Sequence, residues 1–418
     1  MSFASGLLLT LALVGAAATL TVHVRGRRLG WGNALWFLAS WLTGELALFH
    51  LVLSALVLTA FAIFTHALSQ PAGRWAAAII GLSWLGLLIA QWRTRTARGV
   101  LEQALRAALG DDYRAHIPED RRARIPDDLS IARLARPFHL RDTEVEWLRD
   151  IPYGDAHPRQ RLDIYRPRGN VRGAPVLLQI HGGAWVIGDK REQALPLIHF
   201  LVARGWVVVA TNYRPSPAHR FPTHLIDCKR ALAWTREHIG GYGGDASFVA
   251  VTGGSAGGHL ATLVALTANR PDLQPGFESA DTSVAACVPF YGVYDFVDRH
   301  KLQGSRELVV DWLARTVMPG PPAQDPALWD LASPITQLHG AAPPFFVLHG
   351  THDSLASVDT ARRFTEELRR HSPRPVAYAE LPGAQHAWEI FHTVRATRST
   401  QAVARFLEWC RATQDARA

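Results

Sequence analysis

The stretch from Phe248 to Leu260 constrains the fold of this chain more than any other. It begins with an apolar, β-branched run that ends at Thr252, continues with Gly253-Gly-Ser-Ala-Gly257, and leads into a helix-forming run, His259 to Ala268. Glycines on both sides of a serine permit a turn that is too tight for larger side chains. A strand–turn–helix unit of this kind holds the serine hydroxyl above the edge of a sheet. The pattern therefore makes Ser255 the candidate nucleophile.

The chain beyond residue 143 alternates short apolar runs with helical patterns. Continuous apolar runs are typical of strands that are buried on both faces of a parallel sheet. The alternation predicts an α/β fold in which a largely parallel sheet is covered by helices on both faces. The expected strands lie at 145–151, 161–167, 174–185, 204–214, 248–252, 285–292, 343–350 and 375–381.

Two further residues would supply the chemistry that a serine nucleophile needs. Asp353 follows the apolar run 343–350, and His386 lies in the loop after the run 375–381. A serine hydroxyl is unreactive until a base removes its proton; an imidazole can do this, and a buried carboxylate fixes the imidazole tautomer. The rivals are weaker, because the adjoining histidines are expected to shape the turn around Asp353 and Asp359 lies in the following helix. These rivals are His349, His352, His392 and Asp359, and His259 is expected to be structural.

The sequence His181-Gly-Gly-Ala-Trp185 ends the apolar run that begins at Ala174. Small residues after a buried strand let backbone N–H groups point into open space, as a loop that stabilises an anion requires. The alternative is a glycine-rich turn without this role. The His-Gly-Gly start favours the anion-binding interpretation.

Several motifs together resemble the α/β-hydrolase superfamily, and within it the esterases related to hormone-sensitive lipase. They cover roughly residues 150 to 410 and comprise His181–Trp185, Asn212–Arg214 with Phe221-Pro222, Gly243–Leu260, Val347–Asp353 and Gly383–Trp388. Two positions depart from the usual pattern of that esterase group. Ala184 stands where a third glycine is usual, and Gly254 where an aspartate is usual. The chain is therefore more similar to a neighbouring branch of carboxylesterases and arylformamidase-like hydrolases.

This resemblance implies a serine carboxylesterase or lipase that forms an acyl-serine intermediate and uses no metal or organic cofactor. It assigns Ser255 as the nucleophile, His386 as the general base and Asp353 as the residue that orients it. It further implies an oxyanion site at Gly182, Gly183, Ala184 and Ala256, in which Gly182 shapes the turn and the other amides bind the anion. An arylformamidase-like amide hydrolase, a lipid acyltransferase and a catalytically silent membrane adaptor are the alternatives.

The first 92 residues differ sharply from the rest because they consist mainly of uncharged apolar runs. A bilayer core needs roughly 20 helical residues, so the sequence predicts a membrane anchor of about three spans, near 3–24, 46–67 and 75–92. The first run could instead be a signal peptide, but no basic segment precedes it. The run 31–68 could also cross twice, and Glu45 and His50 within it mark either an intramembrane site or an interface. Several spans followed by a hydrolase resemble actinobacterial membrane lipases and esterases of the Lip group.

Arginines predict the orientation of these spans. Arg25, Arg27 and Arg28 follow the first run, and Arg93, Arg95 and Arg98 follow the last. Because positive residues favour the cytoplasmic side, three spans would leave everything after residue 93 in the cytoplasm, and four would reverse this. The net charge of +8 is not gathered in basic blocks interleaved with aromatics, so nucleic acid is not an expected partner.

Residues 93–145 are charged and helical in pattern, and connect the anchor to a catalytic domain at 146–418. Apolar residues between Val100 and Leu109 recur at helical spacing, and Gly110 ends the run. The segment could be a stalk on the membrane surface or a helical cap over the catalytic domain. The three cysteines are far apart and predict neither a disulfide framework nor a metal site.

Overall fold

A computed structural model of the chain describes residues 2–26, 32–140, 142–303 and 306–416. Its centre is an eight-stranded sheet in the order β1-β2-β4-β3-β5-β6-β7-β8. The strands are β1 (Val145–Pro152), β2 (Arg161–Pro167), β3 (Ala174–Ile180), β4 (Val207–Thr211), β5 (Gly244–Gly254), β6 (Ala286–Phe290), β7 (Phe345–Gly350) and β8 (Val376–Leu381).

The six strands from β3 to β8 are parallel, whereas β1 and β2 pair antiparallel at one edge. Every residue of β3 is buried, which explains why this strand reads as a continuous apolar run rather than an alternating one. The loops after β5, β7 and β8 leave the sheet at the same edge because these strands run in the same direction. Residues distant in sequence are thereby brought to one side of the molecule.

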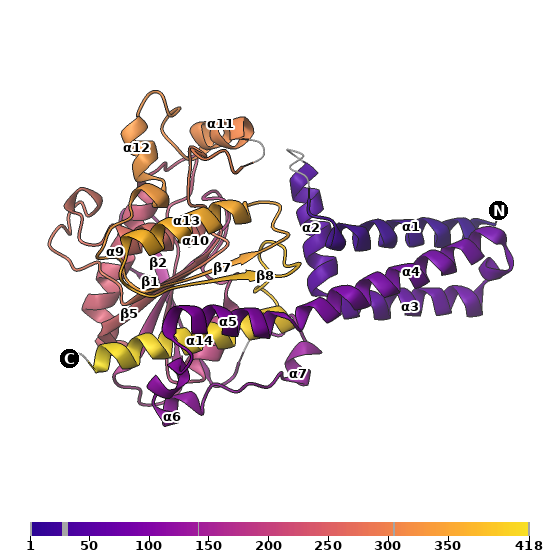
Figure 1. Ribbon diagram of the computed structural model, residues 1–418, viewed down its shortest axis with the longest axis horizontal. Helices are drawn as coiled ribbons and strands as arrows, with labels where there is room; N and C mark the ends of the chain where they lie inside the picture. The colour runs from indigo at the N-terminus through magenta and orange to yellow at the C-terminus, as the bar shows by residue number, and fades with distance from the viewer. Residues whose placement is uncertain (1, 27–31, 141, 304–305, 417–418) are drawn as a thin grey trace.

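Helices cover both faces of the sheet (Figure 1). One face packs against α9 (Thr223–His238), α10 (Ala256–Leu266) and α13 (Val358–His371), and the other against α5 (Ala97–Leu109), α8 (Leu195–Val202) and α14 (Val394–Asp415). In α13, for example, Ala361, Phe364 and Leu368 recur at helical spacing and are fully buried against the sheet. The expected largely parallel sheet with helices on both faces is confirmed.

Shorter helices lie in the connections: α6 (Glu119–Arg122), α7 (Ile131–Leu134), α11 (Arg306–Thr316) and α12 (Pro326–Leu331). For the segment 93–145 the sequence left a stalk and a cap open. In the structure its main helix, α5, buries Leu101 and Leu105 in the same core as α14 and the sheet. This part of the segment is therefore one of the helices that cover the sheet, and it lies next to α14.

The N-terminal part contains α1 (Phe3–His23), α2 (Gly32–Glu45), α3 (Ala47–Phe64) and α4 (Pro71–Thr94). In the part of the chain that the structure describes, three stretches are long and apolar enough to cross a membrane: Phe3–His23, Ala47–Phe64 and Pro71–Leu109, in which α4 leads into α5. Helices α1, α3 and α4 lie side by side and project away from the sheet domain (Figure 1). Arg27 and Arg28, which belong to the predicted cytoplasmic arginines, lie outside the described residues.

Helix α2 runs across the ends of α1, α3 and α4, between these helices and the sheet domain (Figure 1). At its C-terminus Glu45 forms an ion pair of 2.6 Å with Arg395, and both side chains are buried. Of the two polar residues that the sequence placed within an apolar run, Glu45 therefore lies at the contact with the sheet domain.

Candidate active site

Ser255 occupies a strained backbone position between β5 and α10. Its φ of 57° and ψ of −121° lie outside the regions that non-glycine residues normally adopt. The amide of Ser255 donates to the carbonyl of Phe290 at 3.0 Å, and the Ser255 carbonyl accepts from the amide of His259 at 2.9 Å. These bonds hold the turn against β6 and the first turn of α10.

Close approach of neighbouring backbone explains the glycines around the serine. A Cβ atom on Gly257 would lie 2.1 Å from the carbonyl oxygen of Ile180, and one on Gly253 would lie 2.4 Å from that of Gly257. Neither position has room for a side chain. The helix that begins at Ala256 can therefore start directly beneath the serine.

Asp353 and His386 form a buried pair at the same edge of the sheet. His386 Nδ1 donates to Asp353 Oδ2 at 2.7 Å, and the amides of Leu355 and Ala356 donate to Asp353 Oδ1 at 2.9 and 2.8 Å. Burial raises the pKa of Asp353, but the charge of His386 and hydrogen bonds from His349 and His386 outweigh it and hold the pKa well below its usual value. The carboxylate thus stays ionised and leaves Nε2 of His386 available as a base.

The rival residues have other partners. His349 Nε2 lies 3.1 Å from the carbonyl of Ala356 and 3.3 Å from Asp353 Oδ2, so it supports the loop after β7 that carries Asp353, here called the acid loop. His352 contacts the carbonyl of Val22, His392 lines a separate cavity with His139, and Asp359 pairs with Arg25 and Arg362. His259 is buried between the indole of Trp185 and the carbonyl of Ala332.

Tyr291, at the end of β6, lies between the serine turn and the histidine. Its ring centroid is 4.3 Å from that of His386, and a Cβ on Gly254 would lie 2.6 Å from its hydroxyl oxygen. The unusual Gly254 therefore makes room for Tyr291. Among the described residues no hydrogen bond joins Ser255 Oγ to His386, and such catalytic bonds often tighten only when substrate binds.

The loop of His181–Trp185 lies directly against the serine turn. A Cβ on Gly182 would lie 3.2 Å from the Cβ of Ser255, and the amide of Gly182 donates to Gln193 Oε1 at 2.7 Å. Gly183 and Ala184 follow with φ values of 113° and 52°. Among the described residues, the loop amides of Gly183 and Ala184 donate no hydrogen bond. The amide of Ala256, the first residue of α10, donates to no acceptor outside that helix. These three amides are therefore free for a ligand, whereas that of Gly182 is used within the fold.

Sequence reasoning missed Glu389, which is buried three residues after His386. Tyr291 donates its hydroxyl hydrogen to Glu389 Oε1, and among the described residues Oε2 has no hydrogen-bond partner. Burial raises the pKa of Glu389 to about 6, although the Tyr291 bond and His386 act in the opposite direction. An acidic residue close to the histidine in sequence was the available signal, but its burial depends on the packing of Tyr291.

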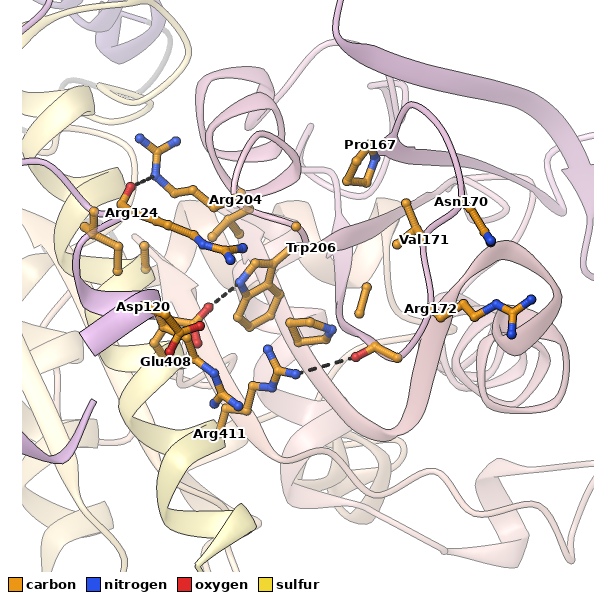
Figure 2. Close-up of a pocket in the computed structure, with 18 residues that line it drawn as sticks. Asp120, Arg124, Pro167, Asn170, Val171, Arg172, Arg204, Trp206, Glu408 and Arg411 are labelled. Atoms are coloured by element: carbon orange, nitrogen blue, oxygen red, sulfur yellow. Dashed lines mark hydrogen bonds between the residues drawn. The ribbon is translucent and has the colours of Figure 1, made fainter. Parts of the chain in front are cut away.

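A cavity of about 460 Å³, rich in arginine, lies at the opposite edge of the sheet. Figure 2 shows Trp206 donating to Glu408, at 2.7 Å, in its wall. Its lining includes Gly173 and Ala174, at the start of β3, so it is separate from the site at the strands' carboxyl ends. Within the described residues no group of three or more His, Cys, Asp or Glu side chains is placed to hold a metal ion.

The fold and the order of strand-end residues define an α/β-hydrolase. Residues 162–368 match the BD-FAE family. The chain is 43% identical to "Probable carboxylic ester hydrolase LipM" of Mycobacterium tuberculosis over 98% of its own length and 94% of that protein, and 48% identical to "Esterase LipQ" of the same organism over 62% and 61%. The crystal structure of inhibited esterase B from Lactobacillus rhamnosis has the same fold, with 22% identity, a TM-score of 0.56 and coverage of 71% of this chain and 93% of that one.

The chain belongs to the family of carboxylic ester hydrolases that includes these mycobacterial esterases, within the hormone-sensitive-lipase-like α/β-hydrolases. The family and fold expected from the sequence are confirmed. The protein is accordingly a hydrolase that acts on carboxylic ester bonds.

Proposed function

We propose that Ser255, His386 and Asp353 are the catalytic triad of this esterase. The observation that carries the proposal is the buried Asp353–His386 pair at 2.7 Å, at the edge of the sheet where Ser255 is held in a strained turn. Ser255 Oγ attacks the acyl carbonyl while His386 Nε2 takes its proton. Nε2 then gives this proton to the departing alkoxide as the C–O bond breaks. Water, deprotonated by the same nitrogen, releases the acid from the acyl-serine.

The amides of Gly183, Ala184 and Ala256 would hold the negative charge that forms on the carbonyl oxygen. Their lack of acceptors beyond their own elements within the described chain supports this role. The first turn of α10 adds the partial positive charge of a helix N-terminus beneath the same oxygen. Gly182 keeps a shaping role, because its amide is bonded to Gln193. Loss of one oxyanion donor typically lowers turnover about a hundredfold or more.

We further propose that residues 1–92 anchor the enzyme in a membrane, that 93–145 connect the anchor to the fold, and that 146–418 carry catalysis. Three apolar helices of sufficient length support this division. Arg25, Arg93 and Arg95 lie at the helix ends nearest the catalytic domain, so the positive-inside rule favours a cytoplasmic catalytic domain. The substrate would be a small-molecule or lipid carboxylic ester.

Purified protein tests the triad directly. Ser255→Ala should abolish turnover of p-nitrophenyl acetate and also labelling by a fluorophosphonate probe, which reacts with activated serines. The matched control is Ser247→Ala, which replaces an exposed serine near the N-terminal end of β5. Unchanged turnover in Ser255→Ala would overturn the assignment.

A further inference from the structure

Helix α2 has buried residues that pack against the rest of the protein and a separate side that is exposed. It lies between two stretches that could span a membrane, α1 and α3, and runs across the ends of both (Figure 1). Ser40 and Thr43 are among its buried residues, whereas three of its leucines are exposed. The arrowheads of β7 and β8 point toward this helix (Figure 1). Helix α2 is therefore placed between the candidate active site and the apolar helices.

The side of α2 that carries Phe37 and Trp41, here called its inward face, contacts the loop of His386 at the centre of that loop. The indole Nε1 of Trp41 donates to the carbonyl of Ala387 at 2.9 Å, directly after His386. The ring of Phe37 meets the His386 imidazole edge to face, with centroids 6.0 Å apart, and stacks on Trp41 at 5.3 Å. The imidazole therefore has one neighbour from the N-terminal part and another, Tyr291, from the sheet.

The C-terminus of α2 fastens both ends of the same loop through one carboxylate. Glu45 Oε1 accepts from Arg395 at 2.6 Å, and Arg395 also donates to the carbonyl of Pro382, where the loop begins. Glu45 Oε2 accepts from the hydroxyl of Thr393, where the loop ends. Because the loop from Pro382 to Thr393 is held at its start, centre and end, movement of α2 would move His386.

The outward face of α2 has no protein to cover it in the described chain. Leu35, Leu38 and Leu42 are 74%, 44% and 36% exposed, and their spacing places them along one side of the helix. Since the adjoining α1 and α3 would enter the bilayer, α2 would lie in the plane of the interface with this side toward lipid. Apolar residues along one side are typical of helices that lie in such an interface.

We propose that α2 couples the active site to the bilayer: its leucine face rests on lipid while its inward face positions His386, so that the substrates are acyl esters that reside in the membrane. This inference rests on the proposed triad and anchor. Trp41 and Glu45 are then positioning residues, which act through the loop of His386 and do not contact the reacting atoms.

The leucine face is tested with the full chain reconstituted in phosphatidylcholine nanodiscs. The triple variant Leu35→Gln, Leu38→Gln, Leu42→Gln should lower hydrolysis of p-nitrophenyl palmitate dissolved in the disc about tenfold, because the helix loses its lipid contact. Turnover of water-soluble p-nitrophenyl acetate should not change, because Trp41 and Glu45 are kept and still hold the loop of His386 in place. The control triple Leu35→Met, Leu38→Met, Leu42→Met keeps the side apolar and should behave as wild type. An unchanged ratio of the two activities, whether both are retained or both fall equally, would overturn the proposal.

The positioning role is tested by Trp41→Phe, which removes the indole donor and keeps an aromatic ring. We expect kcat for p-nitrophenyl acetate to fall roughly threefold to tenfold, as for loss of one hydrogen bond, with KM and Tm unchanged. Trp75→Phe, on the exposed surface of α4, is the matched control. An unaltered kcat, or a loss matched by a fall in Tm, would contradict the positioning role. Turnover that survives Ser255→Ala would instead contradict the triad itself, so the two failures are distinguishable.

Discussion

Asp353 keeps its negative charge in the protein interior because its partners converge on both carboxylate oxygens. Two backbone amides donate hydrogen bonds to Oδ1, and ring nitrogens of His386 and His349 lie 2.7 and 3.3 Å from Oδ2. In the proposed triad, the carboxylate would fix the imidazole with its proton on Nδ1 and favour the imidazolium that forms during attack. Orientation and charge therefore both depend on this one side chain.

Replacing this carboxylate by an amide should remove its effects on the orientation and charge of His386 without preventing folding. Asp353→Asn keeps the size of the side chain, but its amide group can present a donor to Nδ1 and so favour the wrong tautomer. We expect kcat for p-nitrophenyl acetate to fall on the order of a thousandfold or more. The control is Asp359→Asn, the acid rival, which should retain activity. Comparable losses in the two variants would contradict the assignment of the acid.

Glu389 should make stability depend on pH in the direction opposite to an ion-paired acid. Burial raises its pKa from 4.5 to about 6, so its contribution to stability is present below about pH 4.5 and is lost as the pH rises through 6. Ionisation at neutral pH then costs on the order of 2 kcal/mol, since one pKa unit corresponds to about 1.4 kcal/mol.

Glu389→Gln cannot ionise and retains an acceptor for Tyr291. The free energy of unfolding of this variant should vary less between about pH 5 and about pH 7.5 than that of the wild type, and be higher at the upper value. Denaturant unfolding at the two pH values measures both quantities. The exposed Glu366→Gln is the control. Parallel pH profiles for the wild type and Glu389→Gln would contradict the prediction.

The three candidate triad residues could be predicted from the sequence because each follows an apolar strand at a predictable edge. Tyr291 and Glu389 could not, because their roles arise from contacts between loops after β6 and β8, which no local pattern encodes. The departure at Gly254 was visible in the sequence. Its cause, the Tyr291 hydroxyl, needed the structure.

Neighbouring elements fix how tightly the serine turn is packed. Gly254 at the end of β5 faces the Tyr291 ring after β6, and a Cβ there would approach the hydroxyl oxygen to 2.6 Å. Gly254→Ala should therefore destabilise the protein by about 1–3 kcal/mol through overpacking. Tyr291→Phe removes the nearest of the obstructing atoms and leaves two ring carbons at 3.0 Å, so the double variant should be more stable than the sum of the single effects by at least about 0.5 kcal/mol. Denaturant unfolding of all four proteins measures this coupling, and strict additivity would refute the explanation.

The six parallel strands, β3 to β8, could be predicted because buried parallel strands read as continuous apolar runs bounded by turns. Helix α8 was not predicted, since Leu195–Val202 is apolar on all sides and shows no helical periodicity. Helix α2 was hidden for a related reason. Trp36 and Trp41 lie in a long apolar run, where interfacial tryptophans are common, and nothing local distinguishes lipid contact from contact with a distant loop.

At the scale of the whole molecule, the apolar helices and the sheet domain are tied together at several places. His352 of the acid loop contacts the carbonyl of Val22 at 3.1 Å, Arg25 pairs with Asp359 at 3.3 Å, and Glu45 pairs with Arg395. Loops that carry the candidate acid and base thus contact the first two helices. Such contacts favour one fixed orientation of the catalytic domain relative to the apolar helices.

The connection between α3 and α4 lies at the end of the helices farthest from the sheet domain (Figure 1). If α1, α3 and α4 span a membrane and the arginine-rich ends face the cytoplasm, Gln70 lies outside the cell. Gln70→Cys should then react with an impermeant maleimide on intact cells, whereas Asn170→Cys, in an exposed loop of the sheet domain, should react only after lysis. Background labelling should be low, because Cys228, Cys287 and Cys410 are all buried. Labelling of Asn170→Cys but not Gln70→Cys on intact cells would place the catalytic domain outside and reverse the orientation. Because α2 joins α1 and α3 on the side of the sheet domain, that result would also move the leucine face to the outer leaflet, without altering the contact between Phe37 and His386.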